Sequence, residues 1–204
     1  MAAILALHKA LYHLGSLILI LAPAERQAKE LFSKVAAAYR TLGLASLPTD
    51  SYRKLGLELT NRSRIEALPG TEKTVRGFSG ADLLIVDEAA RVADELYYAV
   101  RPMLAVSGGT MILLSTPFGR QGVFYEEWTG DRPWERYKVP ASQCPRIPES
   151  FLEEESEALG PWWFQQEYGC EFMDTVDQVF ATEAVERAMR SDIKPLILGG
   201  GSSG

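Results

Sequence analysis

Short runs of apolar residues alternate with longer amphipathic segments along most of this chain. The apolar runs 17–21, 83–86 and 111–114 are each bounded by turn-forming or polar residues. Continuous apolar runs of this length predict strands buried on both faces, as in a parallel sheet covered by helices. The segment 24–42, between the first two runs, has a helical apolar stripe and is followed by Gly43. The pattern therefore predicts an α/β fold with a mostly parallel sheet.

The rest of the chain gives a more mixed pattern. Residues on both sides of Asn61-Arg62-Ser63 alternate between polar and apolar, which predicts a strand pair at a sheet edge. A run of glutamates from Glu149 onward predicts an acidic, solvated helix that Gly160-Pro161 interrupts. We expect the strand pair over 57–60 and 64–68, a further strand over 134–139, and helices over 2–13, 89–106 (bent at Pro102), 123–129 and 162–168.

Polar groups follow directly after two of the predicted strands. Asp87-Glu88 ends the run 83–86, and Ser115-Thr116 followed by Pro117 ends the run 111–114. Open α/β sheets bind ligands at the carboxyl ends of their strands. Two acids in this place form the Walker B pattern, in which the first holds Mg²⁺ and the second orients and deprotonates a water.

Each of these groups also has a plainer interpretation. An acidic first turn favours the dipole of a following helix, so Asp87-Glu88 is equally compatible with a simple strand–helix junction. The hydroxyls of Ser115-Thr116 would lie beside the acids, where they can sense a γ-phosphate, but Thr-Pro is also an ordinary turn. Arg76, in the Gly- and Ser-rich loop before the acidic strand, can reach a phosphate or a rim carboxylate, or be a surface arginine.

Composition narrows these possibilities only modestly. The chain has 204 residues, 47% hydrophobic and 24% charged, which indicates a globular domain with a full core. Its net charge of −6 argues against a basic footprint over the whole surface and leaves a local patch open. Cys144 and Cys170 have no metal-ligand spacing, which favours free thiols in a reducing cytosol. No apolar run approaches the roughly 18–20 residues that span a bilayer, so no membrane association is expected.

Taken together, the motifs resemble the ATPase domain of the large terminase subunit, the DNA-packaging motor of tailed bacteriophages. Residues 17–32 resemble the family's strand and helix after the nucleotide loop, and 68–90 resemble the segment around its Walker B acids. Leu114–Gly119 resembles its coupling motif, and 164–172 the end of the domain before a nuclease linker. The resemblance implies a three-layer P-loop NTPase-like fold.

The resemblance also implies roles and partners. Asp87 would serve Mg²⁺, Glu88 would be the catalytic carboxylate, and Ser115 and Thr116 would be the coupling pair, with Arg76 contacting nucleotide or a neighbouring subunit. ATP and Mg²⁺ are the implied cofactors. Double-stranded DNA, the portal protein and the small terminase subunit are the implied partners of a homo-oligomeric ring in the cytoplasm of the host cell.

Two family elements have no counterpart in the sequence. A P-loop requires G-x-x-x-x-G-K-[ST] before a helix, and Gly15-Ser16 lacks the lysine and follows a predicted helix. No acid cluster of an RNase H-like nuclease is present. We therefore expect a truncated ATPase domain over 1–177, without the N-terminal strand and P-loop, a linker-like tail over 178–204, and exposed strand edges.

Such a fragment of the packaging motor is expected to be inactive alone. Two alternatives remain. One is a non-catalytic docking subunit of a packaging complex, and the other is a fragment of a helicase-like Asp-Glu ATPase.

Overall fold

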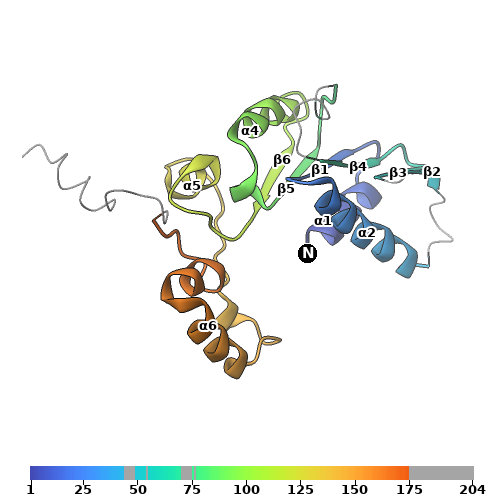
Figure 1. Ribbon diagram of the computed structural model, residues 1–204. Coiled ribbons are helices and arrows are strands. Elements are labelled where there is room, and N and C mark those ends of the chain that lie inside the picture. Colours follow the sequence, from blue (N-terminus) through green and yellow to red (C-terminus); the bar gives the residue numbers. More distant parts are fainter. Residues whose placement is uncertain (44–48, 54, 70–74, 76, 175–204) are drawn as a thin grey trace, which may run out of the picture. The chain divides into compact units, whose positions relative to one another are not determined.

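A mixed β-sheet organises the chain (Figure 1). The structure is a computed structural model that describes residues 1–43, 49–53, 55–69, 75 and 77–174. The six strands of the sheet lie in the order β2-β3-β4-β1-β5-β6. Their bounds are Leu17–Ala22 (β1), Thr49–Arg53 (β2), Gly56–Leu59 (β3), Arg64–Pro69 (β4), Leu83–Asp87 (β5) and Thr110–Leu114 (β6).

The sheet is mostly parallel, as the apolar runs predicted. The strands β4, β1, β5 and β6 are parallel to one another, whereas β2 and β3 form an antiparallel extension on β4. The predicted strand pair is present as β3 and β4, but it does not lie at the edge of the sheet as expected. β4 lies inside the sheet beside β1, and the outer strand on that side is β2, whose polar sequence gave no strand signal.

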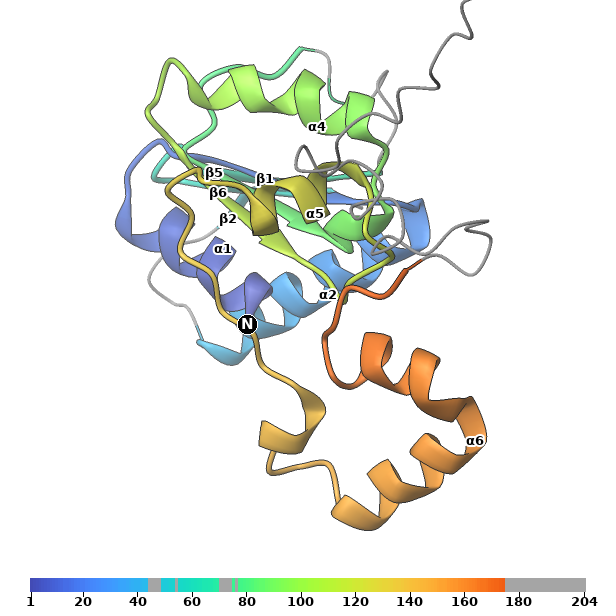
Figure 2. The same ribbon diagram turned by 90° about the vertical axis from the view of Figure 1, so that its left-hand side faces the viewer.

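Helices cover both faces of the sheet and give it three layers (Figure 2). Successive side chains of a strand point to opposite faces, so β1 contributes to two cores. Ile18 and Ile20 join the cluster formed with α1 (Ala2–Tyr12) and α2 (Glu25–Thr41). Leu19 and Leu21 join the cluster formed with α4 (Asp94–Val100) on the other face.

The segment after β5 differs from the single bent helix predicted over 89–106. It divides into the 3₁₀ helix η1 (Ala89–Arg91), α4 and the 3₁₀ helix η2 (Arg101–Leu104). Val92 and Ala93 both adopt extended backbone angles, which separates η1 from α4. Pro102 lies at the start of η2, where its missing N–H and its ring prevent α4 from continuing.

Within the described residues, three further helices follow β6: α5 (Gly122–Thr129), the 3₁₀ helix η3 (Ala141–Gln143) and α6 (Glu149–Glu167). The predicted strand over 134–139 is wrong, because this segment has no regular structure and joins no strand of the described sheet. α6 bends at Gly160, which has φ 74° and ψ 164°, so its acidic first arm and its second arm from Pro161 are separate helical pieces. None of the helices in the described ranges combines the length and hydropathy needed to cross a bilayer.

A buried carboxylate ties α5 to α4 and to the chain that follows. Glu127 is 7% exposed and accepts hydrogen bonds from the Tyr97 hydroxyl at 2.8 Å and the Trp134 indole N–H at 2.7 Å. Its other partner is the guanidinium of Arg132. Burial, followed by the hydrogen bond to Glu127, raises the pKa of Tyr97 to about 12. These bonds fix the position of α5, which begins just beyond the end of β6.

Substitution in the central strand should be far more damaging than substitution at the surface. Leu19 is fully buried in β1, so Leu19→Ala removes packed methyl groups and should lower the free energy of unfolding by about 2–5 kcal/mol. Leu14 is 83% exposed, so Leu14→Ala is the matched control and should change it by less than about 0.5 kcal/mol. Urea denaturation measures both. Equal midpoints for the two variants would contradict this placement of β1.

Candidate functional site

The register between β5 and β6 brings the two polar strand ends to one rim of the sheet. Asp87 is paired with Leu114 in the parallel ladder, so Glu88 and Ser115 are the next residues along adjacent strands. The Ala90 N–H donates a hydrogen bond to Ser115 Oγ at 3.2 Å. The sequence-predicted residues Asp87, Glu88, Ser115 and Thr116 therefore lie together. Arg76 falls outside the described residues.

Glu88 is held in an unusual backbone conformation. Its φ of 51° and ψ of 42° are left-handed, a region that a residue with a Cβ adopts at a cost of roughly 1–2 kcal/mol. The Arg91 N–H donates to the Glu88 carbonyl at 2.8 Å, and this bond closes the turn that follows. Strained residues of this kind gather at functional sites. The turn directs the chain sharply away from β5, and Glu88 stays at the rim with its side chain 38% exposed.

Asp87 is suited to a metal that arrives with its own ligands. It is partly buried at the last position of β5. Within the described ranges, there is no group of three or more His, Cys, Asp or Glu side chains that would hold a metal by themselves. Mg²⁺ commonly binds through one or two carboxylates, water and substrate phosphates. Asp87, a single carboxylate at the end of β5, fits that pattern.

Arg91 is a member of the site that the sequence pattern did not single out. Its Nη1 lies 3.5 Å from Glu88 Oε2 and 3.5 Å from Thr116 Oγ1. Its Nη2 lies 3.3 Å from Glu167 Oε1 at the end of α6, and its guanidinium stacks on Phe118 at 4.6 Å from the ring centroid. The only local signal is the spacing of Glu88 and Arg91 by one turn, because Thr116 and Glu167 are distant in sequence.

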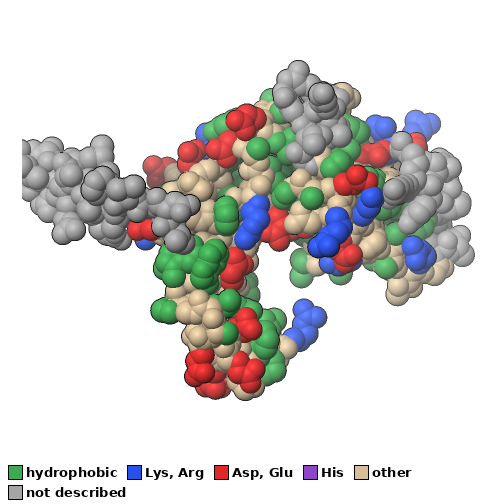
Figure 3. All heavy atoms as spheres, in the orientation of Figure 1, with side chains coloured by type: hydrophobic (Ala, Val, Ile, Leu, Met, Phe, Trp, Pro, Cys, Tyr) green, Lys and Arg blue, Asp and Glu red, His purple; other side chains and the backbone are tan. Residues whose placement is uncertain are grey.

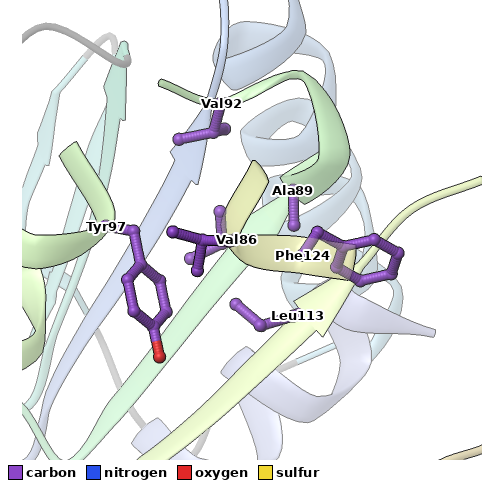
Figure 4. A pocket seen from close by; sticks show the side chains of 7 residues that line it. Val86, Ala89, Val92, Tyr97, Leu113 and Phe124 are labelled. Carbon is purple, nitrogen blue, oxygen red and sulfur yellow. The ribbon is translucent and has the colours of Figure 1, made fainter. Parts of the chain in front are cut away.

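Apolar packing supports the rim from the α4 side of the sheet. Figure 4 shows Val86 and Leu113 from the two strands facing Phe124 of α5 and Tyr97 of α4, with Ala89 beside them. The cavity between these side chains is only about 10 Å³, about the space of one water. The strand ends are therefore backed by a well-packed layer.

A larger pocket, of about 200 Å³, opens beside Ser115 on the side of the C-terminal segment. Phe124, Trp128 and Phe172 supply much of its apolar wall, and Lys138 adds a cation. The ring of Phe172 lies 5.1–6.3 Å from three aromatic rings of α5. These aromatic side chains are partly buried and pack on one another at the wall of the pocket.

The surface of α6 confirms the solvated acidic helix that the sequence predicted. Figure 3 shows acidic side chains gathered over this helix, and Glu149, Glu153, Glu154 and Glu157 are all exposed. Phosphate backbones bind through Lys and Arg, so this face would repel a nucleic acid.

A mostly parallel sheet between two helical layers, with acids at the carboxyl rim, places the chain in the class of P-loop NTPase-like α/β proteins. The family model described as the N-terminal part of the T4likevirus-type terminase large subunit matches residues 1–187. The chain therefore belongs to this family of terminase large subunits. A search of curated proteins found no match.

Solved large terminases share the fold. The ATPase domain from Thermus phage P74-26 is 22% identical, with a TM-score of 0.67 over 84% of this chain and 82% of that one. The large terminase of another thermophilic bacteriophage, in complex with ATP-gamma-S, is 10% identical, with a TM-score of 0.67 over 85% of this chain and 44% of that one. The same terminase in complex with ADP is 10% identical, with a TM-score of 0.64 over 80% of this chain and 42% of that one. The chain thus spans less than half of this second terminase.

The left-handed backbone at Glu88 should make glycine stabilising there. Glu88→Gly relieves the contact of the Cβ, and we expect the free energy of unfolding to rise by about 1 kcal/mol. Glu126 is exposed inside α5, so Glu126→Gly is the matched control and should lower it by about 1 kcal/mol. Thermal and urea unfolding measure both changes. A loss of stability in Glu88→Gly as large as in the control would rule out the strained conformation.

Proposed function

We propose that this chain is part of a DNA-packaging motor ATPase in which Glu88 is the catalytic carboxylate. The observation that supports this most is the adjacency of Glu88 and Ser115 at one rim, created by parallel pairing of β5 and β6. In this proposal Asp87 binds Mg²⁺, and Ser115 and Thr116 couple hydrolysis to movement. ATP would supply the phosphoryl group, and Mg²⁺ would neutralise the charge that develops on the phosphate oxygens.

The residues of the chain divide the work at the rim. Glu88 would orient a water and accept its proton, and its partly exposed carboxylate is reachable for that purpose. Ser115 is already committed to the Ala90 N–H, so its position reports any shift of the turn after Glu88. Arg76 is proposed to contact the nucleotide or a neighbouring subunit.

We further propose that these 204 residues do not hydrolyse ATP by themselves. They contain no G-x-x-x-x-G-K-[ST] sequence, so the backbone amides that cradle phosphates and the lysine that contacts the β and γ oxygens are not supplied. Electrostatic stabilisation of the transferring phosphoryl group depends on such donors. The rim would then hold the water-activating half of a site whose phosphate-binding half comes from another segment.

The partners follow from the family. We propose that the motor acts on double-stranded DNA as a homo-oligomeric ring together with the portal protein and the small terminase subunit, in the cytoplasm of the host cell. The domain is proposed to cover 1–177, with 178–204 as a linker-like tail. The acidic arm of α6 supports a placement of α6 away from the DNA.

Adding a phosphate-binding segment should separate the two halves of the proposal. We expect the 204-residue chain to show no ATP turnover above background. A fusion with a strand and a G-x-x-x-x-G-K-[ST] loop ahead of Ala2 should hydrolyse ATP in a Mg²⁺-dependent manner. Glu88→Gln in that fusion should lower kcat by about 10²–10⁴-fold, because the water loses its base.

The matched control in the fusion is Glu95→Gln, an exposed glutamate on α4, which should leave kcat unchanged. Phosphate release and circular dichroism are measured on every variant. Mg²⁺-dependent turnover by the unfused chain would contradict its proposed inactivity. A fully active Glu88→Gln fusion would contradict the role of Glu88.

One observation favours the second candidate function, a non-catalytic docking subunit. β6 is the last strand of the described sheet, and its apolar residues Met111–Leu114 are only partly buried. An outer strand with free backbone groups can accept a strand from another protein. Co-purification of the chain with a full-length large terminase would support docking, and a monodisperse monomer that does not bind that terminase would count against it.

A further inference from the structure

Arg91 connects three parts of the site that are far apart in sequence. It lies on η1, and its guanidinium faces Glu88 on its own turn, Thr116 of the proposed coupling pair and Glu167 of α6. Phe118, two residues beyond Thr116, covers its face at 4.6 Å. A guanidinium has a planar fork of donors that can address several acceptors at once, which a lysine ammonium on a flexible stem does less well.

The contacts of Arg91 are too exposed to water for this residue to act mainly by stabilising the fold. Its side chain is 34% exposed, and the carboxylate partners Glu88 and Glu167 are 38% and 33% exposed. Ion pairs that open to water contribute little to folding stability. Their consequence here is geometric, because the same guanidinium limits the orientation of a carboxylate beside η1 and of a carboxylate on α6.

The end of α6 is attached to the rim at a second point, next to Glu167. Gln166 is 1% exposed, and its Oε1 accepts a hydrogen bond from the Gly119 N–H at 3.3 Å. Gly119 belongs to the turn that follows Thr116, so Gln166 holds the backbone of that turn while Glu167 holds Arg91. A shift of α6 would therefore move both the turn at Gly119 and Arg91, which contacts Glu88.

From this geometry we propose that Arg91 is a positioning residue that sets the orientation of the Glu88 carboxylate and links it to α6 through Glu167. The proposal rests on the proposed role of Glu88 in hydrolysis. Glu88 and Glu167 share one guanidinium, so their side-chain positions depend on each other. If α6 moved away, Arg91 would keep only its contacts with Glu88 and Thr116. With α6 in place, the guanidinium contacts Glu167 as well.

NMR of the side-chain carboxyl carbons of Glu88 and Glu167 tests whether Arg91 orients both carboxylates. The measurement uses the 204-residue chain and needs no ATP. With ¹³C-labelled glutamate, the two resonances are assigned from Glu88→Gln and Glu167→Gln. Arg91→Gln should shift both resonances, and Arg91→Lys should restore them only in part, because a lysine ammonium on a flexible stem addresses two separate carboxylates less well than the planar guanidinium does. Arg101→Gln is the matched control, since Arg101 lies over the ring of Tyr97 and should affect neither resonance.

Hydrogen exchange tests the link to α6 independently. Arg91→Glu or Glu167→Arg alone should speed exchange of the amides in 162–169 by about three- to tenfold, and the charge-reversed pair should recover to within about twofold. Glu157→Arg, on the exposed acidic arm, should leave 162–169 unchanged.

Three results would overturn the proposal: a Glu88 resonance that ignores Arg91→Gln, full rescue of both resonances by Arg91→Lys, or exchange that is the same in all variants. None of these readouts depends on turnover. An inactive fusion would therefore contradict the proposed function while leaving the Arg91 link intact.

Discussion

The parallel pairing of β5 with β6 is the constraint on which the rest of the site depends. It places residue 87 opposite residue 114, so that an acidic strand end and a hydroxyl-bearing strand end meet at one rim. A slip of one residue would turn every side chain of β6 to the other face of the sheet and would separate Ser115 from the turn after Glu88. Val86, Leu113 and Phe124 pack together behind these strands, and a slip would break this packing.

The main elements of this arrangement could be predicted from the sequence. The runs 17–21, 83–86 and 111–114 became β1, β5 and β6. β1 and the apolar part of β5 are buried on both faces, as such runs predict, whereas β6 lies at the edge of the described sheet and is only partly buried. The rim position of Asp87 and Ser115 then follows from the rule that parallel strands end on the same side. The amphipathic stripe of 24–42 likewise became α2.

The remaining features depend on tertiary contacts that a local pattern does not contain. The left-handed turn at Glu88 is supported by a bond to Ser115, which is 25 residues away from its donor Ala90. The convergence of Glu167 on Arg91 spans 76 residues. The sequence of 134–139 was compatible with a strand, but a strand also needs a neighbour, and β6 does not pair with this segment in the described sheet. Arg76 lies outside the described residues, so its role stays a prediction.

The bend at Gly160 divides α6 into two arms that make different contacts. The second arm carries the residues that touch the rim, while the first carries exposed glutamates and meets the second through Glu155, which accepts a hydrogen bond from the Tyr168 hydroxyl at 2.9 Å. Tyr168 directly follows Glu167 in the chain, so the two arms form a short lever whose outer end is acidic and whose inner end rests on Arg91. A displacement of the outer arm would therefore reach Glu88, the proposed catalytic carboxylate, through Glu167 and Arg91.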